Sequence, residues 1–167
     1  MDYSVKVDKY HPISEDYFKD LMLVPIVTDT EGRESFVEKK TYEAYLSLRA
    51  CLLEKESIEI GIDSAYRDIE TQVRIMREFT EKYGEEYAKA TVATPGTSEH
   101  HTGLALDICP RINGEWIVEN DDMLALLDIF ARIHAHLSEF GFVLSYPKGS
   151  LEATGFDYEP WHIRYFE

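Results

Sequence analysis

Strand-like and helix-like segments follow one another along this chain without the regular spacing of repeated β-α-β units. Residues 58–62 alternate along the chain so that apolar side chains share one face, which is typical of a half-buried strand. Residues 42–54 carry apolar side chains at intervals of three or four, which is typical of an amphipathic helix. Strands separated by helices of unequal length favour an α+β fold. We therefore expect a single domain with a small antiparallel sheet flanked by helices.

Capping residues mark further elements. Asp68 is suited to cap a helix that runs to about Tyr83 and ends at Gly84. The other expected elements are a helix from Asp121 or Asp122 to Phe140, strands at 103–108, 142–146 and 161–165, a loop at 91–99 and a turn at 110–114. Residues 1–40 are expected to be irregular with short helical pieces. The length of 167 residues fits one domain.

The charge of the chain argues against two classes of partner. With 17 basic and 32 acidic residues the formal net charge is −15, which disfavours binding to nucleic acid or to an anionic membrane surface. No stretch approaches the ~20 apolar residues of a membrane span, and no basic segment followed by an apolar one opens the chain. As written, the sequence predicts a cytoplasmic protein. A chain trimmed of an export signal or anchor would look the same and would be extracellular or membrane-anchored.

The two cysteines, Cys51 and Cys109, are too few for a disulfide scaffold. Cys51 lies in an apolar helical run and Cys109 follows an apolar strand-like run, and no C-x-x-C occurs. We expect both to be buried thiols.

The segment from Ser98 to Asp107 carries the most informative polar residues. A loop histidine, His100, precedes Gly103 and then Asp107 at the end of an apolar strand, so that an imidazole and a carboxylate can meet at one point. Zinc accepts both ligand types, and a catalytic zinc site uses three protein ligands plus water. This segment therefore predicts two ligands of a metal site.

His162 is the best candidate for the third ligand, because a carboxylate, Glu159, lies three residues before it. Hydrolysis at a metal needs a base to take a proton from water, and Glu159 can serve as that base. Spacing alone leaves other interpretations open. A histidine before a strand is more often a surface or hydrogen-bonding residue, Asp107 can cap a turn, and Glu159 can be an exposed acid before a proline.

Read together, these segments resemble a known family. Residues 98–107 match the S-x-H-x-x-G-x-A-x-D signature, and residues 159–162 match the E-x-W-H signature, of the VanY- and VanX-type D-alanyl-D-alanine carboxypeptidases and dipeptidases. Residues 140–149 resemble the VanY-type stretch that leads to the second signature, and residues 64–72 resemble the family's Y-R-S-x-x-x-Q segment. The likeness runs from about residue 58 to 167, which we expect to be the catalytic core of a peptidase domain spanning 1–167.

The resemblance implies roles for individual residues. His100, Asp107 and His162 would bind Zn²⁺ at the edge of the sheet. Glu159 would be the catalytic base, and Arg67 would stabilise the developing oxyanion. The implied substrate-binding residues are Ser64, Tyr66, Gln72, Ser98 and Tyr146.

Two positions depart from the family pattern. Ser145 stands where such proteins often have arginine, which affects the expected substrate contacts there. Asp68 stands where a serine usually follows the Tyr-Arg pair, and either residue can cap a helix.

The implied activity is that of a zinc carboxypeptidase, which removes the C-terminal D-alanine of peptidoglycan stem peptides or their precursors. L,D-carboxypeptidase and D,D-dipeptidase activity stay open as alternatives within the family. A non-catalytic module that binds cell-wall peptides is the alternative of another class, and the intact Glu159 argues against it. A structural zinc site is disfavoured because such sites usually fill all four positions with protein ligands, often cysteine.

Overall fold

The computed structural model describes residues 1–89 and 91–167, and its centre is a five-stranded sheet. Every strand pair in this sheet is antiparallel. The strands follow the order β3 (Ile60–Ser64), β4 (Ala105–Ile112), β7 (His162–Tyr165) and β6 (Phe142–Leu144), and β5 (Glu115–Trp116) pairs with the end of β4. The predicted α+β class with a small antiparallel sheet is confirmed.

The hydrophobic core lies between this sheet and two helices, α1 (Lys39–Glu56) and α5 (Leu127–Leu137). Each helix buries side chains spaced three or four residues apart, which form one apolar face. Full burial of one such large side chain contributes ~1.5–3 kcal/mol. The main contributors are Tyr45, Leu48 and Leu52 of α1, Phe130, Ile133 and Leu137 of α5, and Leu106, Ile108 and Ile163 of the strands. Cys51 and Cys109 are buried free thiols, as predicted.

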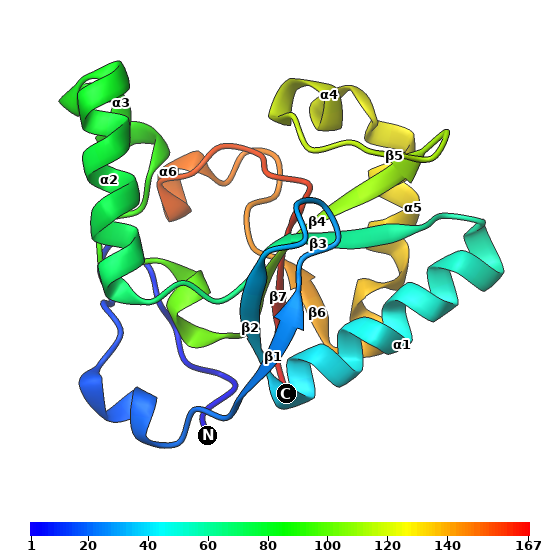
Figure 1. Cartoon of the computed structure of the whole chain (residues 1–167), viewed down its shortest axis with the longest axis horizontal. Coiled ribbons are helices and arrows are strands. Elements are labelled where there is room, and N and C mark those ends of the chain that lie inside the picture. Colours follow the sequence, from blue (N-terminus) through cyan, green and yellow to red (C-terminus); the bar gives the residue numbers. More distant parts are fainter.

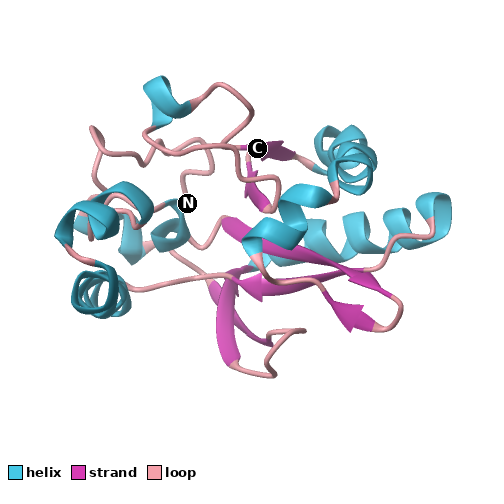
Figure 2. Ribbon diagram, turned by 90° about the horizontal axis from the view of Figure 1, so that it is seen from above, coloured by secondary structure: helices cyan, strands magenta, loops and turns pink.

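A second group of helices lies on the other side of the molecule. Figure 1 shows α2 (Ile69–Tyr83), α3 (Glu85–Thr91) and α6 (Leu151–Thr154) separated from α1 and α5 by the strands, and Figure 2 shows the same arrangement from above. The predicted cap of α2 is confirmed, because the Asp68 carboxylate accepts a hydrogen bond from the Thr71 N–H at 2.7 Å. Among the described residues, no helix combines the length and the apolar character needed to cross a bilayer.

Residues 1–40 differ from the prediction. Besides the 3-10 turn η1 (Glu15–Lys19), they contain an antiparallel hairpin of β1 (Leu23–Val27) and β2 (Glu34–Glu38). Pro25 weakens the strand pattern in the sequence, but a two-stranded pair consists only of edge strands, which tolerate proline. Backbone hydrogen bonds from distant segments hold the hairpin, including Tyr66 N–H to Phe36 C=O at 3.0 Å.

Other boundaries also differ from the prediction. The helix expected to end at Phe140 is divided into α4 (Asn120–Ala125), α5 and the 3-10 turn η3 (Ser138–Phe140), because Leu126 leaves helical geometry at φ −95° and ψ 41°. β4 continues to Ile112, through most of the expected turn at 110–114. Helix α1 starts at Lys39, three residues earlier than expected, because the Glu38 side chain caps it.

Candidate active site

Neighbouring strands bring two of the predicted ligands side by side. Asp107 on β4 lies directly opposite His162 on β7, and Ser64 on β3 lies opposite Asp107 from the other side. Successive side chains of a strand point to opposite faces of the sheet. Leu106 and Ile163 pack in the core, and Asp107 and His162 therefore face away from it.

The third predicted ligand, His100, lies on the 3-10 turn η2 (Glu99–Thr102) that precedes β4. Ser98 caps this turn by accepting a hydrogen bond from the His100 N–H at 3.3 Å. Gly103 then turns the chain into β4 with φ +71°, and a Cβ atom there would approach Leu23 to 3.0 Å. Only glycine adopts this conformation without strain. The spacing of serine, histidine and glycine thus serves to present the imidazole at the start of β4.

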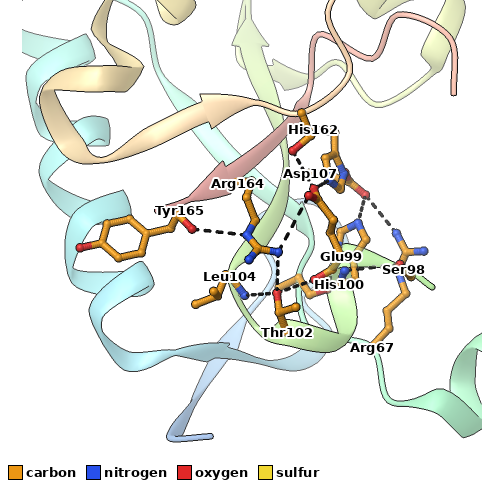
Figure 3. A network of polar contacts seen from close by, with 12 residues as sticks. Arg67, Ser98, Glu99, His100, Thr102, Leu104, Asp107, His162, Arg164 and Tyr165 are labelled. Carbon is orange, nitrogen blue, oxygen red and sulfur yellow. Dashed lines mark hydrogen bonds and ion pairs between the residues drawn. The ribbon is translucent and has the colours of Figure 1, made fainter. Parts of the chain in front are cut away.

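Ligand atoms of His100, Asp107 and His162 all lie within 4.8 Å of one another. The His100 Nε2 atom is 3.1 Å from Asp107 Oδ2, and the His162 Nδ1 atom is 2.9 Å from Asp107 Oδ1. Figure 3 shows the two rings directed at the carboxylate from different segments. Tetrahedral ligands ~2.0–2.2 Å from one zinc ion lie about 3.3–3.6 Å apart. The donor set and its spacing therefore fit a zinc ion.

Hydrogen bonds to atoms outside this trio orient both rings. His100 Nδ1 is 2.6 Å from the Ala65 carbonyl oxygen, which can only accept, so Nδ1 carries the proton and Nε2 presents its lone pair to Asp107. A lone pair that faces a carboxylate oxygen is stabilised by a cation between them. His162 Nε2 is 2.9 Å from Glu99 Oε2, which leaves Nδ1 to face Asp107. Such outer hydrogen bonds are typical of metal-binding histidines.

Burial and charge set the protonation of the trio. Burial, together with the positive charge of Arg67, lowers the pKa of His100 to about 4, so this ring is neutral at pH 7. Burial also acts to lower the pKa of His162, but its hydrogen bonds to Asp107 and Glu99 outweigh that effect and raise it to about 10. Burial acts to raise the pKa of Asp107, yet the hydrogen bond and positive charge of His162 hold it well below its usual value. A metal ion bound here would displace the proton from His162 Nδ1.

Glu159 lies beside this trio. Its backbone carbonyl accepts a hydrogen bond from the His162 N–H at 3.2 Å, and its own N–H donates to the Tyr146 carbonyl at 3.1 Å. Burial raises the pKa of Glu159 to about 7, although the charge of His162 opposes this. A carboxylate poised near neutral pH is suited to accept a proton from water. The ring of Tyr146 packs on the His162 imidazole, with centroids 4.7 Å apart.

Arg67 is held in place above Asp107. Its Nε–H donates to Ser64 Oγ at 3.2 Å, and one terminal nitrogen donates to Asp107 Oδ2 at 3.1 Å. The Nδ1 atom of His101 is 2.6 Å from the Arg67 carbonyl oxygen and ties its backbone to the η2 turn. The guanidinium is therefore fixed at the edge of the trio.

All of the predicted site residues line one cavity of about 850 Å³, which reaches from the metal-ligand trio to the β1–β2 hairpin and to α2. The Gln72 amide donates to the Ala93 carbonyl at 2.9 Å, while its buried Oε1 has no partner within the described part of the chain. Ser64 and Ser98 each accept a hydrogen bond from the chain, so their hydroxyl protons remain available. The cavity thus offers these two hydroxyl donors to a polar ligand, whereas the buried Gln72 Oε1 atom is not open to it.

One largely buried carboxylate in the site, Glu99, was not predicted. Its side chain is 14% exposed and contacts His162, Ser145 and Arg164. Next to His100 in a strongly acidic chain, a single glutamate has no pattern that distinguishes it from surface acids. One of these contacts involves Ser145, the residue that departs from the family pattern. Its hydroxyl donates to Glu99 Oε2 at 2.6 Å.

A second cluster of possible ligands lies outside the cavity. Cys51, His136 and Glu139 bring ligand atoms within 4.8 Å of one another on α1, α5 and η3. His136 already contacts Glu139 at 2.7 Å and Glu56 at 3.1 Å, and Lys55 lies 3.5 Å from Glu139. These groups neutralise one another, which is typical of a surface ion-pair network.

The chain is similar to known proteins in sequence. The family model for VanY, D-alanyl-D-alanine carboxypeptidase, matches residues 34–167. Two relatives are each 31% identical over 95% of this chain. The chain spans 58% of the length of the first relative, the protein YodJ of Bacillus subtilis (strain 168). It spans 80% of the other, the bifunctional D-Ala-D-Ala dipeptidase and D-Ala-D-Ala carboxypeptidase VanXYC of Enterococcus gallinarum.

Solved structures agree with this match. A variant of the D,D-pentapeptidase VanY from a VanB-type resistance cassette, in complex with Zn(II), is 27% identical with a TM-score of 0.75, covering 98% of this chain and 87% of that one. The LD-carboxypeptidase LdcB is 30% identical with a TM-score of 0.75, covering 95% of this chain and 74% of that one.

Proposed function

The chain belongs to the VanY D-alanyl-D-alanine carboxypeptidase family, and on this premise we propose that it is a zinc carboxypeptidase acting on the C-terminal D-alanine of peptidoglycan stem peptides or their precursors. The observation that carries the proposal is the convergence of two imidazoles and a carboxylate in the cavity that also contains Glu159. In this proposal His100, Asp107 and His162 hold the zinc ion.

The chain's own residues would handle the proton and the developing charge. When bound, zinc lowers the pKa of a water molecule towards ~7 and polarises a carbonyl group. Glu159 would accept the proton of the attacking water and return it to the leaving amine. Arg67 would donate hydrogen bonds to the carbonyl oxygen as its negative charge develops, which favours the transition state over the substrate. Ser64 and Asp107 support Arg67 in this role, because they hold its guanidinium before the substrate arrives.

The polar groups of the cavity support recognition of a peptide with a free C-terminus. The hydroxyl protons of Ser64 and Ser98 can be donated to a terminal carboxylate. Tyr66 and Tyr146 line the same cavity and would bound the substrate laterally.

The size of the cavity favours a carboxypeptidase over a strict dipeptidase. Its volume of about 850 Å³ lies in the upper part of the ~300–1,000 Å³ range of ligand pockets. Beyond the metal-ligand trio it continues past Phe36 on the hairpin to Arg74 and Phe79 on α2. A two-residue substrate would leave this extension empty, whereas a stem peptide could occupy it.

Replacing Arg67 with lysine should lower turnover about 10–100-fold without releasing zinc. Lysine keeps the positive charge but lacks the planar set of donors that spans Ser64, Asp107 and a substrate carbonyl. Steady-state kinetics paired with metal analysis of the same sample measures both effects. Unchanged kinetics would mean that Arg67 only forms the ion pair with Asp107.

Substrate selectivity is the experiment that tests the proposed function. The enzyme should shorten a stem pentapeptide to the tetrapeptide, and it should cleave the C-terminal amide or an L-alanine counterpart much more slowly. A site built to hydrogen-bond a substrate group discriminates against analogues that lack it by as much as ~10⁴–10⁵-fold. Mass spectrometry of digests of pentapeptide, tetrapeptide, their amides and free D-Ala-D-Ala separates the possibilities.

Each alternative has its own signature in these digests. Conversion of tetrapeptide to tripeptide would indicate an L,D-carboxypeptidase, and cleavage of free D-Ala-D-Ala alone would indicate a dipeptidase. Equal cleavage of acids and amides would contradict the exopeptidase proposal. A zinc-loaded protein that cleaves none of these peptides would be the non-catalytic binding module.

A further inference from the structure

Glu99 forms the centre of a buried polar network behind the metal-ligand trio. Its Oε2 atom lies 2.9 Å from His162 Nε2 and 2.6 Å from the Ser145 hydroxyl, which donates to it. Its Oε1 atom lies 3.9 Å from a terminal nitrogen of Arg164, whose side chain is fully buried. Figure 3 shows Glu99 between His162 and Arg164, on the side of the His162 ring away from Asp107.

The network also holds the backbone of Glu99. The Thr102 hydroxyl donates to the Glu99 carbonyl at 2.6 Å, and Arg164 donates to the Thr102 hydroxyl at 3.3 Å. Arg164 is itself anchored by a hydrogen bond to the Val5 carbonyl at 2.7 Å. The position of the carboxylate is therefore determined by segments from both ends of the chain.

We propose that Glu99 is a positioning residue, which holds the His162 imidazole with Nε2–H directed at its carboxylate so that the Nδ1 lone pair faces the metal position. The inference rests on the proposed zinc site. A flip of the ring about its χ2 angle would put the carbons Cδ2 and Cε1 where Nδ1 and Nε2 now lie, and the Glu99 acceptor makes the present orientation the stable one. His100 uses the Ala65 carbonyl for the same purpose, so each ligand histidine has its own outer acceptor.

The placement of Glu99 next to His100 adds a link between the two ligand-bearing segments. One short turn, η2, supplies a ligand through His100 and orients a second ligand on β7 through Glu99. A purely structural carboxylate would only need to balance the charge of Arg164. That contact is the longer one, at 3.9 Å, whereas the contact with His162 has hydrogen-bond length.

Comparing Glu99→Met with Glu99→Gln separates the positioning of His162 from a purely structural role. Methionine is of similar size but offers no strong acceptor, so we expect the zinc dissociation constant to rise about 10–100-fold. Glutamine loses the charge but keeps an oxygen that can accept from His162 Nε2–H, so we expect a clearly smaller rise. Chelator competition measures the affinities. The visible spectrum of the cobalt(II)-loaded chain should change in Glu99→Met and be retained in Glu99→Gln.

Glu38→Gln is the matched control, because Glu38 is also a buried carboxylate but caps α1 away from the cavity. It should lower the melting temperature and leave zinc affinity unchanged. Equal losses of affinity in Glu99→Met and Glu99→Gln, or none in either, would overturn the positioning role while leaving the zinc site intact. A wild-type chain that binds no zinc would overturn both proposals. If Glu99→Met does not fold, Ser145→Ala is the deciding variant, because it removes the hydrogen bond that holds the Glu99 carboxylate. We then expect weaker zinc binding, and an unchanged zinc affinity would refute the positioning role.

Discussion

Replacing Glu159 with glutamine is expected to lower the turnover of a D-alanyl peptide by about 10²–10⁴-fold while the protein stays folded and keeps its zinc. The amide occupies the same volume but cannot accept a proton from the attacking water. The ligand trio does not include Glu159, so metal content should match that of the wild type. Kinetics and metal analysis of one preparation test both statements. Turnover near the wild-type value would mean that another group is the base.

The pH dependence of the wild type should report the same residue. Burial raises the pKa of Glu159 to about 7, and only the ionised carboxylate can accept a proton. Activity should therefore rise with pH, with a midpoint at or below about 7, because a bound cation adds positive charge that favours the carboxylate. This acid limb should be absent from the residual activity of Glu159→Gln.

Glu159→Gln should lower turnover but raise the stability of the metal-free protein at neutral pH. In the folded chain the pKa of Glu159 is about 7, above the ordinary value of 4.5 expected in the unfolded chain. The protonated form therefore stabilises the fold, and this contribution is complete below pH 4.5 and lost as the pH rises through 7. Glutamine resembles the protonated form. Near pH 4, metal-free Glu159→Gln should have the same free energy of unfolding as the metal-free wild type. At pH 8 the free energy of unfolding of the variant should be higher by up to about 3 kcal/mol. Denaturant unfolding at both pH values measures the difference.

His162→Ala and His100→Ala should each abolish stoichiometric zinc binding and reduce hydrolysis to background. A catalytic zinc site has three protein ligands, and with one removed the remaining imidazole and carboxylate hold the ion only weakly. Purified wild-type protein should carry about one zinc per chain by elemental analysis, in line with a single trio in the cavity.

The histidine of the second cluster provides the control for these variants. His136 contacts two carboxylates but lies outside the cavity, so His136→Ala should keep one zinc and full activity. Full zinc occupancy in both His100→Ala and His162→Ala would show that the trio is not the zinc site. Loss of zinc in His136→Ala would instead assign the metal to the surface cluster.

The local patterns of the chain were sufficient for much of the fold. The apolar spacing of residues 42–54 predicted most of α1, and Asp68 and Gly84 predicted the ends of α2, because caps and amphipathic faces depend on neighbouring residues. The β1–β2 hairpin was missed. Pro25 obscures its strand pattern, and the hydrogen bonds that hold it come from Tyr66 and Gly103, far along the chain.

The amino-acid sequence alone was enough to name the trio of ligand candidates and Glu159, because their residue types allow a metal site and the two signatures shared with a known family imply these roles. It could not show that Asp107 and His162 are opposite each other, since that depends on the register of two strands 55 residues apart. It also could not separate Glu99 from the other 31 acidic residues, the remainder of 32 Asp and Glu. Only the tertiary structure brings that carboxylate against His162 of β7 and against Ser145, the residue after β6, because these partners lie 63 and 46 residues away.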